Sequence, residues 1–267
     1  MCNSNLTKGL IVAAIRVSFG LVNRAPAAPN LLVNGDFEQT NLPSGQQNGG
    51  PILTTGLGLP GWTLTAGDGA NMNIYQYTQS FNSSYNPIPE SGNYAVWLDG
   101  SQGTGSAQGN NFQQFGLGPT ISQSLSLGPG KYNLSFYINT EVGNVRGNQK
   151  GGTSGVLLDL LGSNISKGSL NDTEFTVSNP LGVSQANAQW QHVTEDFTVT
   201  KFSAVTLSFQ DDPNPALANQ SLSSNISIDN ASITLLSPVP EPSSLALLAV
   251  GTMSLFGFQV WRRRSHG

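Results

Sequence analysis

The residues of this chain that could carry acid–base or nucleophilic chemistry are few. His192 is the one histidine between positions 28 and 237. No G-x-S-x-G motif accompanies it, so the sequence does not indicate a serine–histidine–acid triad. Glu195 and Asp196 are neighbours on a predicted strand, where adjacent side chains point to opposite faces and cannot converge on one glycosidic bond. Asp211 and Asp212 fall in a predicted loop, where they either solvate the surface or bind a cation. We therefore predict no catalytic residue.

Aromatic and amide side chains crowd together between positions 71 and 86. Tyr75, Tyr77 and Tyr85 stand there among several Asn and Gln residues. Such a mixture can stack on sugar rings while its amides bond to sugar hydroxyls. Packing is the alternative role for these rings, because aromatic side chains bury large areas. We predict a ligand-binding surface at the three tyrosines, and we assign Trp62 and Trp97 to the core.

The composition excludes several classes of protein. Only 10% of the 267 residues are charged, against roughly 25% in an average soluble domain. Acidic residues outnumber basic ones between the two ends of the chain, which makes nucleic acid an improbable partner. The sole cysteine, Cys2, permits neither an intramolecular disulfide nor a cysteine zinc site. Hydrophobic residues at 37% are sufficient for one packed domain, which we place at residues 28–237.

Short alternating runs broken by Gly, Pro and Asn predict strands throughout this domain. The expected strands are 31–33, 61–65, 71–77, 94–98, 121–127, 132–138, 156–161, 174–177, 190–199, 205–210 and 226–236. A hairpin is expected where Pro129 and Gly130 form a type II turn between two of them. The pattern predicts an all-β fold, an antiparallel β-sandwich with jelly-roll character.

The last expected strand changes phase along its length. Ile226 and Ile228 occupy even positions, whereas Ile233 and Leu235 occupy odd ones. A β-bulge near Asp229 must therefore turn the inward face over.

Both ends of the chain have the composition of targeting segments. Residues 1–27 contain an apolar stretch preceded by Lys8, interrupted by Arg16 and followed by small residues, which predicts an imperfect signal peptide. The alternative is an amphipathic helix that remains attached. At the other end, the uncharged stretch 245–261 predicts one C-terminal transmembrane helix, with a buried core helix as the alternative.

The C-terminal segment, residues 238–264, resembles the PEP-CTERM sorting signal of bacteria that make extracellular polysaccharide. It combines a Pro-Glu-Pro element, the apolar stretch and a basic cluster, in that order. These motif residues are Val239, Pro240, Glu241, Pro242, Arg262, Arg263 and Arg264. The resemblance implies processing by an exosortase, a membrane peptidase, during transit to the cell surface, with transient anchoring in the membrane.

The domain itself resembles the galactose-binding-like sandwich of carbohydrate-binding modules. The resemblance rests on Asn30 to Glu38, Gly61-Trp62, Leu98 to Gly100, Pro129 to Tyr132 and Ile228 to Asn230, in that order. It implies a structural calcium ion shared by an acidic residue after the first strand and an aspartate of the last strand. The matching residues are Glu38 or Asp36, and Asp229. The alternative is that Asp229 only caps or solvates the bulge.

The sequence therefore favours a noncatalytic, exported surface or matrix protein that binds carbohydrate. Two other hypotheses stay open. A secreted polysaccharide hydrolase would need two carboxylates converging in a cleft. A structural spacer would have no ligand.

Overall fold

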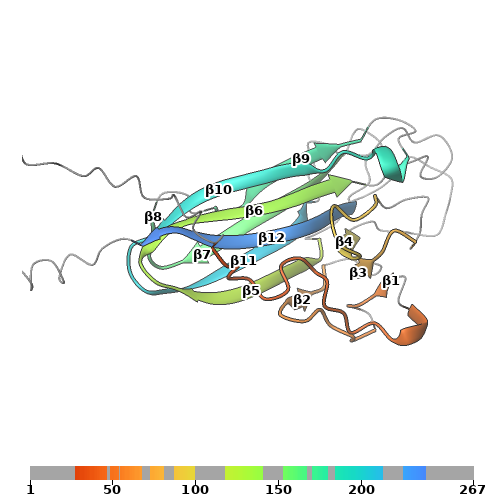
Figure 1. Cartoon of the computed structure of the whole chain (residues 1–267), viewed down its shortest axis with the longest axis horizontal. Coiled ribbons are helices and arrows are strands. Elements are labelled where there is room, and N and C mark those ends of the chain that lie inside the picture. The colour runs from red at the N-terminus through yellow and green to blue at the C-terminus, as the bar shows by residue number, and fades with distance from the viewer. Residues whose placement is uncertain are drawn as a thin grey trace, which may run out of the picture.

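The structure is a computed structural model of the chain, and it describes most of the predicted domain. The described residues are 28–46, 49–53, 55–67, 73–80, 87–99, 118–140, 153–166, 170–179, 184–212 and 225–238. They form two antiparallel sheets packed face to face, which confirms the all-β sandwich (Figure 1). Within these ranges no helix is long and apolar enough to cross a membrane. The predicted signal peptide 1–27 and spanning helix 245–261 lie outside them.

One sheet has seven strands and the other has five. The order in the seven-stranded sheet is β1-β3-β4-β12-β6-β10-β8, and in the five-stranded sheet it is β2-β5-β11-β7-β9. The seven strands are β1 (Gly49–Pro51), β3 (Asn73–Tyr77), β4 (Ala95–Asp99), β12 (Asn225–Pro238), β6 (Gly130–Thr140), β10 (Gln191–Val199) and β8 (Ile165–Ser166). The five are β2 (Thr63–Thr65), β5 (Thr120–Leu127), β11 (Ser203–Asp212), β7 (Thr153–Gly162) and β9 (Thr173–Ser178). Two 3-10 turns, η1 (Ser44–Gln46) and η2 (Gln185–Asn187), accompany them.

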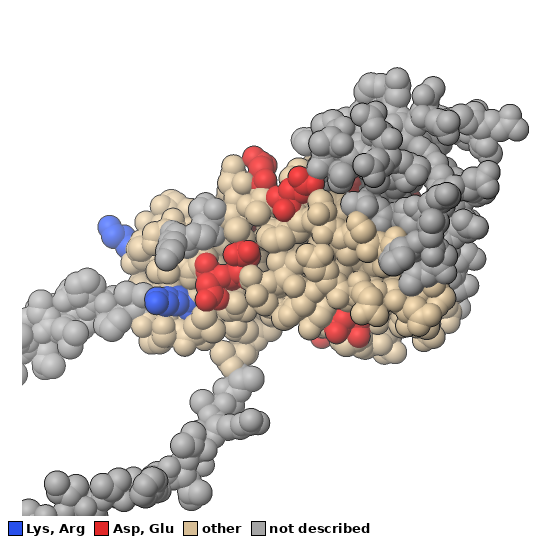
Figure 2. Space-filling model, turned by 90° about the horizontal axis from the view of Figure 1, so that it is seen from above, with Lys and Arg blue, Asp and Glu red and all other residues tan. Residues whose placement is uncertain are grey.

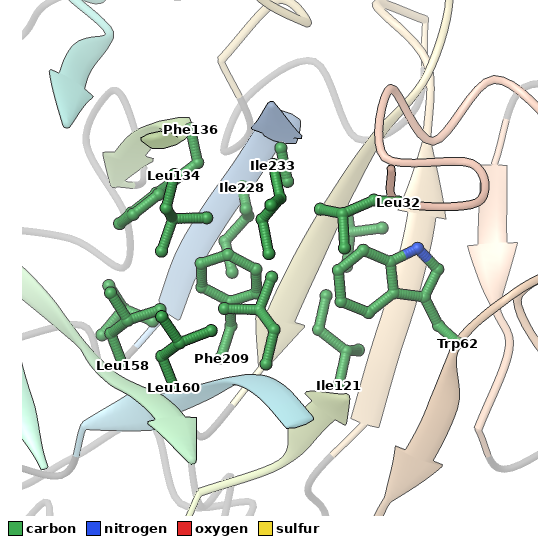
Figure 3. Close-up of a cluster of buried hydrophobic side chains, with 14 of the residues drawn as sticks. Leu32, Trp62, Ile121, Leu134, Phe136, Leu158, Leu160, Phe209, Ile228 and Ile233 are labelled. Atoms are coloured by element: carbon green, nitrogen blue, oxygen red, sulfur yellow. The ribbon is translucent and has the colours of Figure 1, made fainter. Parts of the chain in front are cut away.

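The core lies between the two sheets and follows the period-2 alternation of the strands. Leu134 and Phe136 of β6 face Leu158 and Leu160 of β7, and Phe209 of β11 lies between them (Figure 3). Trp62 is buried beside Phe209, with ring centroids 6.1 Å apart, as expected for a core residue. The alternating side chains that predicted the strands are therefore the ones that join the two layers.

The expected hairpin around Pro129 is wrong. β5 pairs with β2 and β11 in one sheet, whereas β6 pairs with β12 and β10 in the other. The chain thus passes from one sheet to the other and forms an arch. Two consecutive amphipathic strands can bury their apolar faces either side by side or across the core, and alternation alone does not separate these cases.

The reason for Gly130 also differs from the expected one. Its φ is not positive, so it does not close a type II turn. A Cβ atom at this position would lie 2.6 Å from Cδ1 of Leu235, so a larger residue would displace that partly exposed side chain. The expected strand at 31–33 is likewise absent: this segment is a bend and turn, attached by Leu31 N donating to Ile233 O at 2.8 Å.

The expected bulge in the last strand is confirmed. The register of β12 against β6 shifts between Asp229 and Ser232, and Asn230 has φ 49°. The segment after Asn30 packs onto this bulge: Ala231 N donates to Gly35 O at 2.8 Å, and Asn30 Nδ2 donates to Ala231 O at 2.9 Å. The first described segment and the last strand are therefore bonded together at the bulge.

Candidate functional site

Aromatic side chains gather on the outer face of the seven-stranded sheet. The alternation that sends Val96 and Leu98 of β4 into the main core places Trp97 on the opposite face of the strand. Trp97 is only 6% exposed there, in a second buried cluster, which agrees with its assignment to the core from the sequence. Its partner on β3 is Tyr75. The two rings stack with centroids 4.7 Å apart and planes at 27°. Tyr75 is half-buried, and Trp190 also packs against the small cluster that contains Trp97.

A second stack lies on the same face, on β6 and β10. Tyr137 and His192 are register partners, and their rings stack with centroids 4.4 Å apart and planes at 14°. His192 is exposed, and its Nε2 lies 2.7 Å from Oγ of Ser135. We call the outward residues Tyr75, Trp97, Tyr137, Trp190 and His192 the aromatic strip. Rings beside hydroxyl and amide groups are the chemistry that recognises the apolar faces and hydroxyl edges of sugars.

The three tyrosines singled out in the sequence have different positions. Tyr75 belongs to the aromatic strip, and burial, followed by the nearby charge of Asp99, raises its pKa. Tyr77 is fully buried, and this burial raises its pKa strongly. Its ring presents no face to a ligand, which favours the packing role. Tyr85 lies outside the described residues.

Sequence reasoning did not identify Tyr137, His192, Trp190 and Trp97 as site residues. Each is an aromatic side chain at, or just before, the outward position of a strand. The sequence does mark aromatic residues at outward strand positions. It does not show which outward face remains accessible to a ligand, so these residues could not be assigned to a site.

Two carboxylates bind the segment that precedes β4. Glu38 Oε1 accepts hydrogen bonds from the backbone N–H groups of Asn93 at 2.8 Å and Tyr94 at 2.9 Å. A Cβ on Gly92, which has φ 65°, would overlap this same carboxylate. The packing of Glu38 against the segment therefore depends on a glycine at that position.

Asp229 holds the same segment from the other side. Its Oδ2 accepts from Glu90 N at 2.8 Å and Ser91 N at 3.3 Å, and its Oδ1 accepts from Asn230 N at 2.7 Å. The side chain is fully buried, and this burial raises its pKa to about 7 despite the three backbone hydrogen bonds. The neighbouring charge of Glu90 raises the pKa further. A buried carboxylate with a second, partly buried carboxylate nearby is chemically suited to a cation.

The predicted metal ligands are only partly brought together. Glu38 and Asp229 contact one common segment, whereas Asp36 is exposed. Among the described residues, no three His, Cys, Asp or Glu side chains form a group that could hold a metal ion. A cation there would need backbone carbonyl oxygens to complete its ligands.

The described strands separate the carboxylates that were considered for catalysis. Asp196 points outward and accepts a hydrogen bond from Asn133 Nδ2 at 2.7 Å, while its neighbour Glu195 has the inward parity of Val193 and Phe197. Adjacent strand positions thus keep the two groups on opposite faces, as the sequence predicts.

The fold and site define a two-layer β-sandwich with an aromatic outer face and a buried acidic anchor. Residues 238–264 match the PEP-CTERM protein-sorting motif, which confirms the sorting signal predicted from Val239 to Arg264. The motif implies export to the cell surface. The motif residues themselves lie beyond the described part of the chain.

Several solved structures resemble the sandwich at low identity. A family 61 carbohydrate-binding module in complex with β-1,4-galactotriose is 15% identical with a TM-score of 0.36, covering 78% of this chain and 99% of that one. The CBM22-1 xylan-binding domain of Paenibacillus barcinonensis Xyn10C is 12% identical with a TM-score of 0.38, covering 80% and 99%. A protein from Bacteroides thetaiotaomicron is 11% identical with a TM-score of 0.36, covering 78% and 100%. A search of curated proteins gives no match.

Proposed function

We propose that this protein is a noncatalytic surface or extracellular-matrix protein that binds polysaccharide through the aromatic strip. The observation that carries the proposal is the pair of ring stacks, Tyr75 on Trp97 and Tyr137 on His192, on the outer face of one sheet. Rings that already stack on each other are held in position, so little conformational entropy remains to be lost when a sugar binds. We also propose that the sandwich has jelly-roll character.

Binding is tested with the full chain in detergent on an array of glycans, together with a measurement of released sugar. We expect retention of polysaccharide without release. Release of sugar would favour the alternative function, a secreted hydrolase. The absence of both retention and release would favour a structural spacer.

Replacing Tyr75 with alanine is expected to weaken polysaccharide retention by about 1 to 3 kcal/mol, the range found when aromatic platforms for stacked rings are removed. The matched control is Phe202→Ala, because Phe202 is an aromatic side chain that is 70% exposed but lies outside the aromatic strip. Retention is measured per folded molecule, alongside thermal unfolding. An equal loss of retention in both variants would contradict a specific role of the strip.

The proposal includes processing of the tail by an exosortase after export, with a signal peptide at 1–27 and a spanning helix at 245–261. The sorting motif at 238–264 supports it. Replacing Pro240, Glu241 and Pro242 with alanine should make full-length protein accumulate in the membrane fraction, because the prolines no longer keep the segment extended for recognition. Fractionation and immunoblotting measure this. Unchanged release of the triple variant would count against exosortase processing.

We further propose that Asp229 and Glu38 contribute to a structural calcium site with nearby backbone carbonyls. A ligand that binds only the folded state stabilises it by mass action. Adding millimolar calcium to chelator-treated protein should therefore raise the melting temperature, and Asp229→Asn should remove most of the rise. Asp36→Asn is the matched control, because Asp36 is exposed, whereas Asp229 and Glu38 accept the backbone hydrogen bonds of the segment before β4. A melting temperature that does not respond to calcium would contradict the proposed calcium site and leave Asp229 with the alternative role of capping the bulge.

A further inference from the structure

Several turns meet at the end of the sandwich where β12 stops. Pro238, the last described residue, lies opposite Gly130 of β6, and Gly130 lies opposite Val199 of β10. The turn after β10 is bonded to the turn between β7 and β8, since Thr200 N donates to Asn164 O at 2.9 Å. The strand ends and turns therefore form one continuous surface at this end.

Both lysines of the described residues lie on this surface. Lys131 is the register partner of Ser237, and Lys201 is in the turn after β10; both are exposed. The same described residues contain twelve Asp or Glu, of which Asp196, the register partner of Asn133, lies two positions along the strand pairing from Lys131. Figure 2 shows Lys side chains at one end of the molecule, with one acidic patch directly beside a Lys and others farther along that face. The described Lys residues are thus confined to this end of the sandwich.

Large apolar side chains are exposed at the same end. Phe202, next to Lys201, is 70% exposed, and Leu236, next to the partner of Lys131, is 56% exposed. A single exposed apolar residue needs no explanation. An aromatic ring and a leucine beside two lysines, however, are the combination that inserts into a lipid interface while the ammonium groups meet anionic headgroups. We call Lys131, Lys201, Phe202 and Leu236 the tail-side surface.

The short chain after Pro238 limits how far the tail-side surface can lie from the membrane. Only six residues separate Pro238 from Leu245, where the uncharged stretch 245–261 begins. Even a fully extended chain spans at most about 25 Å over this distance. While the tail is anchored, the tail-side surface therefore stays close to the membrane surface, and no other end of the sandwich is held there.

We propose that the tail-side surface docks on anionic lipid headgroups of the membrane that holds the tail. The proposal rests on the proposed membrane anchoring of the tail and adds an orientation: the sandwich is held with this end on the bilayer. The aromatic strip, on the outer face of the seven-stranded sheet, then faces sideways rather than into the lipid. Cleavage of the tail leaves only this weak contact, so the sandwich can leave the surface.

The test uses the full chain, with Cys2→Ser, reconstituted into phosphatidylcholine vesicles with or without 30% phosphatidylglycerol. A fluorophore is attached at Ser163→Cys, an exposed position beside Asn164, or at Asn187→Cys, an exposed position in η2. Nitroxide-labelled lipids then quench a fluorophore that lies near the bilayer. We expect strong quenching at position 163 but not at 187, and more quenching with phosphatidylglycerol than without it.

The variant K131Q/K201Q/F202S should reduce quenching at position 163 while flotation with the vesicles stays unchanged. Each lysine near an anionic surface changes the association by about fivefold, and added salt should act in the same direction. Val33→Ser is the matched control, because Val33 is 56% exposed but bonded to Gln123 in the middle of β5.

Two results would overturn the docking proposal. One is equal quenching at positions 163 and 187, and the other is unchanged quenching at position 163 in the triple variant. If the unsubstituted chain does not float with the vesicles, the proposed membrane anchoring of the tail is refuted instead. Crosslinked dimers without quenching would assign the surface to a second copy and also overturn docking.

Discussion

Replacing Asp229 with alanine is expected to lower the free energy of unfolding by about 3 to 5 kcal/mol, because three backbone N–H groups lose their acceptor. These groups belong to Glu90, Ser91 and Asn230, and the carboxylate that serves them is fully buried. Denaturant unfolding in the presence of a chelator measures the loss without any contribution from calcium. Asp196→Ala is the control, since Asp196 is exposed and accepts one side-chain bond from Asn133; its effect should be below about 0.5 kcal/mol.

The loss caused by Asp229→Ala should depend on pH in a defined direction. Burial raises the pKa of Asp229 to about 7 in the folded state, whereas the unfolded value is the ordinary one near 3.8. A raised pKa means that the folded state binds the proton more tightly, so this group contributes most below the unfolded value and its contribution falls as the pH rises through about 7. The alanine variant should therefore lose more stability at pH 5 than at pH 8. The opposite trend would mean that a bound cation or a hydrogen bond favours the ionised form.

Gly35→Ala should be nearly as damaging, with an expected loss of about 3 kcal/mol from overpacking and broken hydrogen bonds. The added Cβ would lie 2.1 Å from the carbonyl oxygen of Ala231, so backbone would have to move. That movement breaks the bond from Ala231 N to Gly35 O and the contact of Asn30 with the bulge. Gly45→Ala is the control, because nothing lies within 4 Å of its Cβ position. Equal unfolding midpoints for the two variants would show that the bulge tolerates detachment of the first segment.

Strand positions could be read from the sequence because each strand has one buried face. Alternation located the longer strands, and the phase change between Ile228 and Ile233 located the bulge. The short strands β1 and β8 were missed, since two or three residues carry no period. The pairing of β5 was also missed: Leu125 and Leu127 alternate in the same way whether the next strand lies beside them or across the core.

The candidate site was only partly predictable for a related reason. Tyr75 was identified from composition, but Tyr77, two residues later on the same face, is buried by its surroundings. Whether an outward ring is covered depends on segments far away in the sequence, such as residues 87–94, where the carbonyl of Ile88 accepts a bond from Trp190. The pairing of Tyr137 with His192 depends on register between strands more than fifty residues apart, which local patterns do not encode.

The place of β12 between β4 and β6 has a consequence for the order of events during synthesis. The last strand of the sandwich to leave the ribosome is an inner strand of the larger sheet, and the first described segment has its bulge as a docking partner (Figure 1). Until residues up to 238 have been synthesised, β4 and β6 have no common neighbour, so the larger sheet cannot be completed.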